Sequence, residues 1–123
     1  MPFWACYDLL TLVNKLIPQE GALYVTAAEK SYQILKVLKF EGAIVHVRLY
    51  KNRFDEIPAR VDPAILTLGT IHDPDGFGMG HLPLSYNTFL GWKPQFLQPG
   101  LVLPDELDGY EMWKQTSDGR SWQ

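Results

Sequence analysis

Four side chains that could bind a metal or act as acids and bases lie within or beside the glycine-rich segment Thr70–Gly80. They are His72, Asp73, Asp75 and His81. Histidine and carboxylate are competent metal ligands, but the spacing matches neither the His-Glu-x-x-His zinc motif nor a calcium-binding loop. A cluster of aspartate, proline and glycine is also typical of turns. We therefore keep this set as an alternative site, that of a small histidine-dependent hydrolase or a metal-dependent enzyme, and expect no metal or cofactor.

The chain also offers nucleophiles, but none stands in a recognised catalytic motif. His81 and Ser85 are close in sequence, yet the Gly-x-Ser-x-Gly elbow of hydrolases is absent from the sequence. Cys6 is the only cysteine, which excludes an internal disulfide and is typical of a reducing compartment. We assign no catalytic residue and expect a protein that is not an enzyme.

A third group of side chains is basic and aromatic and follows one predicted hairpin. It consists of Lys36, His46, Arg48, Tyr50, Lys51 and Arg53. Arginine and aromatic side chains are enriched in protein interfaces, and the same types also bind single-stranded nucleic acid. The alternative is a solvated face that nearby acids such as Glu41 and Asp55 balance. We predict that this basic set binds an acidic protein partner.

The hairpin that carries the basic set spans Tyr32–Tyr50, with a three-residue turn at Glu41–Ala43. β-Branched and aromatic residues are dense on both sides of the turn, as in strands. The predicted register pairs Leu35 with Leu49, Val37 with Val47 and Lys39 with Val45 on one face, and Lys36 with Arg48, Leu38 with His46 and Phe40 with Ile44 on the other. Because burial of one face fixes the register, we expect the first face in the core and the second partly in water.

The remaining pattern predicts helices at the two ends of a sheet. The expected elements are a helix over Pro2–Ile17, a strand over Ala22–Ala27, a further strand over Ala64–Gly69, an extended His81–Ser85, a helical turn over Tyr86–Leu90 capped by Ser85, a helix over Asp105–Gln115 and a polar tail over Ser117–Gln123. Pro18 ends the first helix, for which a strand over Phe3–Tyr7 before a shorter helix is the alternative. The predicted fold is α+β: a small, strongly bent, barrel-like antiparallel sheet with N-terminal and C-terminal helices.

Length and composition limit the class of protein. A chain of 123 residues predicts a single domain over residues 1–123, and 46% hydrophobic with 13% aromatic residues suffices for a packed core. The net charge of −3 argues against a general nucleic-acid binder. No stretch approaches the roughly 20 apolar residues of a membrane span, and the N-terminus lacks the basic region of a secretory signal. We therefore expect a cytoplasmic protein.

Two patterns resemble known families. Tyr32–Leu38 followed by Val45–Tyr50 resembles strands of small SH3-like or Tudor-like barrels. The overall layout, with Gly-His-x-Pro-Leu-Ser at Gly80–Ser85 and Glu-Leu-Asp-Gly-Tyr-Glu-Met-Trp-Lys at Glu106–Lys114, resembles small bacterial immunity proteins of toxin systems. A Tudor-like reader would need an aromatic cage, for which Tyr24, Tyr32 and Tyr50 are the candidates.

The resemblance to immunity proteins implies a protein that binds and neutralises a protein partner, such as a toxin, without catalysis. Our leading prediction is therefore a non-catalytic bacterial protein-binding module. The histidine-dependent or metal-dependent enzyme and a nucleic-acid-binding barrel are the alternatives.

Overall fold

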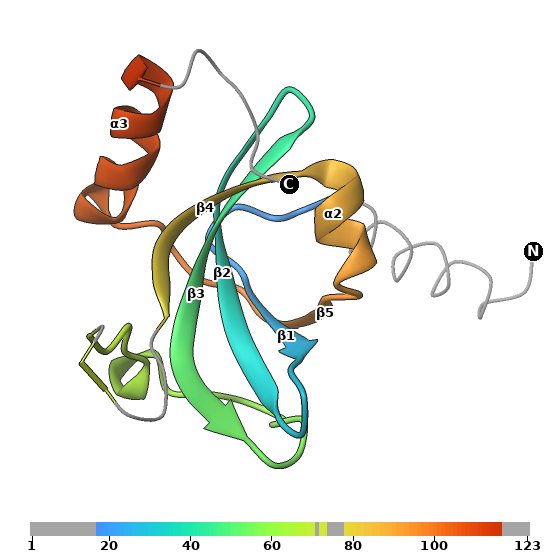
Figure 1. Ribbon diagram of the computed structural model, residues 1–123. Helices are drawn as coiled ribbons and strands as arrows, with labels where there is room; N and C mark the ends of the chain where they lie inside the picture. Colours follow the sequence, from blue (N-terminus) through green and yellow to red (C-terminus); the bar gives the residue numbers. More distant parts are fainter. Residues whose placement is uncertain (1–16, 71, 74–77, 117–123) are drawn as a thin grey trace, which may run out of the picture.

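Five antiparallel strands form one open sheet in the order β4-β3-β2-β1-β5 in the computed structural model (Figure 1). The structure describes residues 17–70, 72–73 and 78–116. The strands are β1 (Leu23–Ala27), β2 (Tyr32–Glu41), β3 (Ile44–Phe54), β4 (Met79–Ser85) and β5 (Gln95–Gln98). This confirms the predicted antiparallel sheet. Because β4 and β5 stand at opposite edges of it, the described strands do not close into a barrel, and the barrel-like prediction is wrong.

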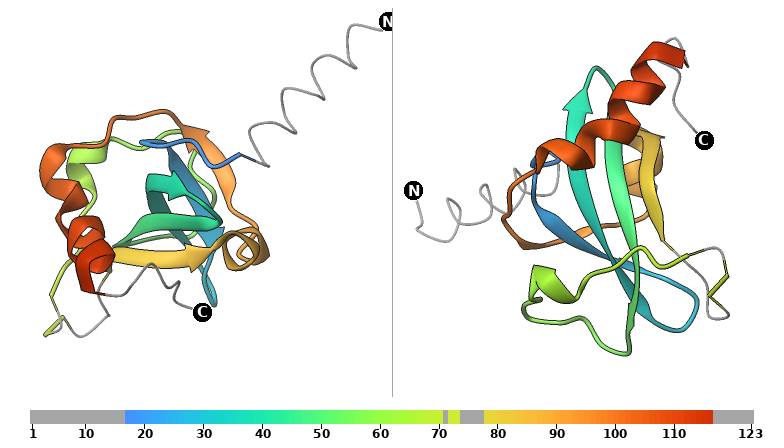
Figure 2. Two further views of the ribbon diagram at one scale, coloured as in Figure 1. Left: turned by 90° about the horizontal axis from the view of Figure 1, so that it is seen from above. Right: turned by 90° about the vertical axis from the view of Figure 1, so that its left-hand side faces the viewer.

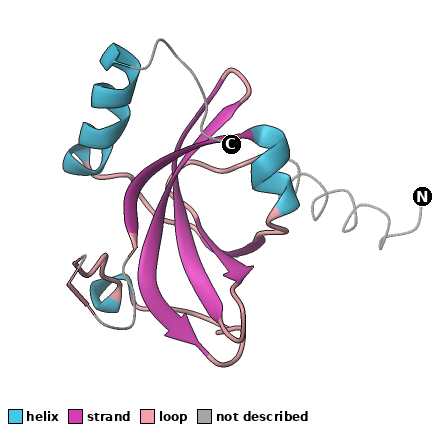
Figure 3. Cartoon of the chain, in the orientation of Figure 1, coloured by secondary structure: helices cyan, strands magenta, loops and turns pink. Residues whose placement is uncertain are grey.

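Two α-helices lie on opposite sides of the sheet (Figures 2 and 3). They are α2 (Tyr86–Gly91) and α3 (Asp108–Thr116), and two 3-10 turns, η1 (Pro63–Ile65) and η2 (Pro104–Leu107), accompany them. The Ser85 hydroxyl accepts the Thr88 N–H at 3.1 Å, which confirms the predicted cap of α2. The predicted C-terminal helix is present as η2 followed by α3. Together with the sheet, these helices confirm the α+β class.

Several predicted elements differ from the structure or fall outside the part it describes. The strand predicted over Ala64–Gly69 is wrong, because Asp62 caps the 3-10 turn η1 there by accepting the Ala64 N–H at 3.0 Å. The extended segment predicted at His81–Ser85 is β4, which begins earlier, at Met79. The N-terminal helix, Cys6 and the C-terminal tail fall on residues 1–16 and 117–123, outside the described residues.

The register of the central hairpin is confirmed in its middle and wrong at its tip. Leu35 pairs with Leu49, Lys36 with Arg48 and Val37 with Val47, as predicted. Beyond Val37 the register shifts, so that Lys39 pairs with His46, Phe40 with Val45 and Glu41 with Ile44. The turn therefore has two residues instead of three, and Gly42 adopts a positive φ of 63° within it. A bulge at Leu38 absorbs the difference and keeps that side chain buried.

The sheet is packed on both faces, by different parts of the chain. One cluster contains Tyr24, Leu35, Val37, Val45, Val47, Leu84 and Phe89, and so extends onto α2. The other contains Leu23, Val25, Ile34, Tyr50 and Val61, and draws on the loop that follows β3. Alternating side chains of one strand enter opposite clusters, as the pleat requires. The basic residues of β2 and β3 continue the second face.

The loop after β3 is also tied to the edge strand β5. The side chain of Gln98 accepts the Val61 N–H at 2.8 Å and donates to the Val61 carbonyl at 2.9 Å. The side-chain amide of Gln98 thus makes both hydrogen bonds that the backbone of a neighbouring strand would make to Val61. The loop is held against the sheet at this point.

We expect Val37→Ala or Val47→Ala to lower the free energy of unfolding by about 1–3 kcal/mol, because each removes fully buried methyl groups from the first cluster. Chemical-denaturation midpoints measure the change. Val102→Ala is the matched control, since Val102 is only half-buried. Wild-type midpoints in both core variants would contradict the register described here.

Candidate functional site

The predicted basic face of the hairpin exists, but the C-terminal segment covers most of it. Lys36 and Arg48 are cross-strand partners on β2 and β3, and His46 lies two residues before Arg48 on β3. Only 9% of Lys36 and 1% of His46 are exposed. The covering elements are η2 and α3, which lie over this side of the sheet (Figure 1). The face is therefore drier than predicted.

A carboxylate from η2 pairs with two cations of this face. Glu106 accepts from Lys36 Nζ at 2.8 Å, and its other oxygen lies 3.7 Å from Arg48 Nη1. Arg48 Nε also donates to the Gly80 carbonyl at 3.2 Å, which ties the cluster to β4. Burial alone would raise the pKa of Glu106, but the Leu103 N–H and Lys36 outweigh it and hold this pKa below the ordinary value. The result is a buried ionic cluster.

Tyr50, the aromatic member of the predicted basic set, lies near this ionic cluster. Burial, together with the Glu106 carboxylate, raises the pKa of its hydroxyl to about 12. The side chain packs in the second core cluster, as does Tyr32, whereas Tyr24 lies in the first. The three tyrosines therefore do not assemble the cage that a Tudor-like reader would need.

Two histidines meet beneath α3, and this pair was not foreseen from the sequence. His46 Nδ1 lies 2.9 Å from His81 Nε2, which brings β3 and β4 side chains together. The rings of Tyr110 and Trp113 stand edge-on to His46, with centroids 4.7 and 4.5 Å away. The Tyr110 hydroxyl donates to the carboxylate of Glu41. The histidine pair thus forms the surface on which α3 docks.

The environment of the pair favours neutral imidazoles. Burial, followed by the neighbouring His81, lowers the pKa of His46 to about 4, and burial also lowers the pKa of His81. The second ring nitrogen of His46, Nε2, is buried and has no hydrogen-bond partner among the described residues. Both histidines are therefore neutral at neutral pH and act as packed, hydrogen-bonded groups.

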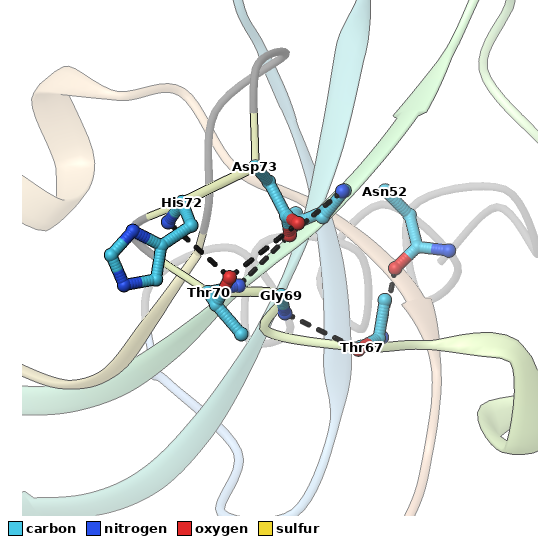
Figure 4. A network of polar contacts seen from close by, with 7 residues as sticks. Asn52, Thr67, Gly69, Thr70, His72 and Asp73 are labelled. Carbon is cyan, nitrogen blue, oxygen red and sulfur yellow. Dashed lines mark hydrogen bonds and ion pairs between the residues drawn. The ribbon is translucent and has the colours of Figure 1, made fainter.

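The described members of the alternative site predicted from the glycine-rich segment have different partners. Asp73 accepts the Thr70 N–H at 2.8 Å and pairs with Lys51 Nζ at 3.0 Å, and both contacts lower its pKa (Figure 4). His72 is exposed, and its N–H donates to the Thr70 hydroxyl at 3.3 Å. Asp75 lies outside the described residues, and His81 contacts His46 instead.

These contacts support turn formation as the role of Asp73. Within the described ranges, no group of three or more histidine, cysteine, aspartate or glutamate side chains is placed to hold a metal ion.

The far end of the hairpin borders an open cleft of about 690 Å³. Its lining residues are Val25, Thr26, Ala27, Tyr32, Gln33, Leu49, Ile57, Gly91, Trp92, Lys93 and Gln95. Arg53 is exposed and is the cross-strand partner of Gln33, which lines the cleft, and its Nη1 donates to the Ser31 hydroxyl at 3.5 Å. The Thr26 hydroxyl donates to the Trp92 carbonyl at 2.9 Å and fixes this wall. The sequence carried no sign of the cleft, because its walls come from three separate segments.

No model of a protein family, no curated protein and no solved structure matches the chain. The resemblances to immunity proteins and to SH3-like or Tudor-like barrels therefore stay predictions. In the part of the chain that the structure describes, no helix has the length and apolar character needed to cross a membrane.

We expect Glu106→Gln to lower the free energy of unfolding by about 3 kcal/mol, because it leaves Lys36 buried without a counter-charge. Glu111→Gln, an exposed change of the same kind on α3, is the control. Since the pKa of Glu106 is lowered on folding, its contribution is present above the ordinary value of 4.5 and is lost as the pH falls below it. Urea melts at neutral and acidic pH test this, and equal midpoints for the two variants would refute it.

Proposed function

We propose that the protein is a non-catalytic protein-binding module of the immunity type, and that an acidic, partly apolar segment of its partner binds in the cleft beside Arg53. The observation that carries the proposal is the joint presence of aromatic walls and nearby cations at one end of the hairpin. Aromatic side chains and arginine are the groups that most often dominate binding energy in protein interfaces.

The walls of the cleft suit an apolar side chain. Trp92 and Tyr32 contribute aromatic rings, and Val25, Leu49 and Ile57 add aliphatic surface. Ile57 is 44% exposed, so much of its side chain is accessible to a partner. A partner side chain inserted here would bury this surface and gain hydrophobic free energy.

The charges around the cleft favour an acidic partner. Among the described residues that line it, Lys93 is the one charged side chain. Arg53 adds a second cation beside the cleft, and its guanidinium can pair with a carboxylate through two parallel hydrogen bonds. Asp55 and Glu56 lie just outside, on the exposed loop that follows β3. Their negative charges would repel a partner whose acidic groups extend beyond Arg53 and Lys93.

The originally predicted basic set takes a divided role in this proposal. Lys36 and His46 are buried beneath the C-terminal segment, and Arg48 pairs with Glu106. Lys51 pairs with Asp73. Arg53 is the member whose exposure fits a direct contact with a partner. The enzyme alternative has less support, because His72 is exposed, whereas His81 contacts His46 and lies near the Trp113 ring of α3.

Arg53→Glu combined with Lys93→Glu should weaken binding of an acidic partner by more than tenfold, about 1.4 kcal/mol, because two attractive contacts become repulsive. Stability should change by less than about 0.5 kcal/mol, since both residues are exposed. The first partner to test is the product of the neighbouring gene, and titration calorimetry measures the affinity. Selection from a random-peptide display library gives a partner-independent test, in which acidic peptides with aliphatic or aromatic side chains should be enriched.

Lys114→Glu is the control for added negative charge, because Lys114 is exposed on α3. Equal affinity in the double variant and the wild type would place the interface elsewhere on the molecule. Enrichment of basic peptides would also overturn the proposal.

A further inference from the structure

The helix α3 docks on the imidazole rings of two titratable residues, His46 and His81. Tyr110 and Trp113 of this helix pack on His46, and Trp113 also lies near His81, with ring centroids 6.3 Å apart. Gly109 approaches His81 so closely that a Cβ on it would lie 2.6 Å from the His81 Cβ. Close approach, edge-on ring packing and burial of His46 thus coincide at one place on the helix.

We propose that α3 is an acid-sensitive cover: it stays on the sheet while His46 and His81 are both neutral, and it leaves when the pair takes up a further proton. This inference is independent of the proposed cleft and concerns the opposite end of the basic face.

The hydrogen-bond geometry of the pair leaves no place for that proton. The favoured tautomer has His46 Nδ1–H donating to His81 Nε2, because the opposite one would place an unpaired N–H at the buried Nε2 of His46. In this tautomer that Nε2 carries only a lone pair. A proton added to His46 sits on Nε2, where no acceptor is present among the described residues. A proton added to His81 Nε2 reverses the bond and forces the His46 proton to the same Nε2. Either route buries an unpaired N–H and a charge, which is costly.

The charged and titratable groups around His46 do not remove this cost. From β2, the carboxylate of Glu41 favours protonation, whereas the ammonium of Lys39 opposes it. From β4, His81 opposes it. From α3, Tyr110 contributes a hydroxyl already bonded to Glu41, and Lys114 stands over the Tyr110 ring at 5.8 Å. Arg48 and Glu106, further along the same face, pair with each other.

The direction of the pH effect follows from comparing the pKa of His46 with α3 docked and with α3 undocked. The pKa of His46 falls from its ordinary 6.5 to about 4 in the docked state, mainly through burial. With α3 undocked, the ring would be less buried, and its pKa would rise towards the ordinary value. For His46, docking is therefore fully favourable above about pH 6.5 and weakens as the pH falls towards 4, by up to tenfold per pH unit.

The ionic cluster next to the pair remains intact over most of this range. The pKa of Glu106 is held below its ordinary value of 4.5, so its carboxylate stays charged between pH 6.5 and 4.5. Lys36 and Arg48 therefore stay paired with Glu106 of η2 while α3 detaches. The release is local, with η2 as its fixed end, and it uncovers the two histidines without unfolding the sheet.

Hydrogen exchange measured by NMR between about pH 7.5 and 5 tests the proposal. In the wild type, protection factors of α3 amides should fall by at least tenfold from neutral to acidic pH, while amides of β2 and β3 keep theirs. His46→Gln can still donate to His81 and does not carry the charge, so it should shrink this pH dependence. His72→Gln, the same change at an exposed histidine, should leave the wild-type profile unchanged.

Gly109→Ala gives a second test that does not alter either histidine. The added methyl group cannot fit against His81, so α3 should be unprotected at all pH values and the His46 ring resonances should titrate at a higher pH than in the wild type. Flat α3 protection in the wild type over the whole range would overturn the proposal. Loss of protection in α3 and the strands together would also overturn it, because it would show global unfolding instead of local release.

Discussion

The long pairing of β2 with β3 has to be buried on both faces, although one of its faces carries charges. On the first face, Val37 and Val47 meet the requirement with apolar contacts alone. On the second, Lys36 is nearly buried, which is tolerable only if an opposite charge accompanies it. Glu106 supplies that charge from the far end of the chain. The position of the C-terminal segment follows from this electrostatic need.

The sequence predicts features that local apolar patterns determine, and it does not predict those that depend on a distant partner such as this counter-charge. The apolar alternation around Leu35 and Leu49 is local and strong, so the middle of the hairpin was predictable. At the tip, a bulge at Leu38 and a tight turn at Gly42 compete with a three-residue loop, and the hydrophobic pattern does not distinguish them. The helix cap at Ser85 was predictable for the same local reason.

The candidate sites depended on contacts that no local pattern encodes. Lys36 and Glu106 are 70 positions apart, and His46 and His81 are 35 apart. Without its partner, Lys36 has the pattern of a surface residue. Proximity in sequence groups His81 with His72, whereas its place on β4 brings it next to β3. The position of Lys36 between the apolar pairs Ile34-Leu35 and Val37-Leu38 is the one local sign that it needs a distant carboxylate.

An open sheet has two edges that could pair with another copy of the chain, and both are modified here. The strand β4 contains Pro83, which has no N–H to offer a neighbour. At β5, the side chain of Gln98 already occupies the Val61 backbone that approaches the edge. Pro83 therefore hinders edge-to-edge addition at β4, and the tethered loop restricts the approach of another chain near Gln98.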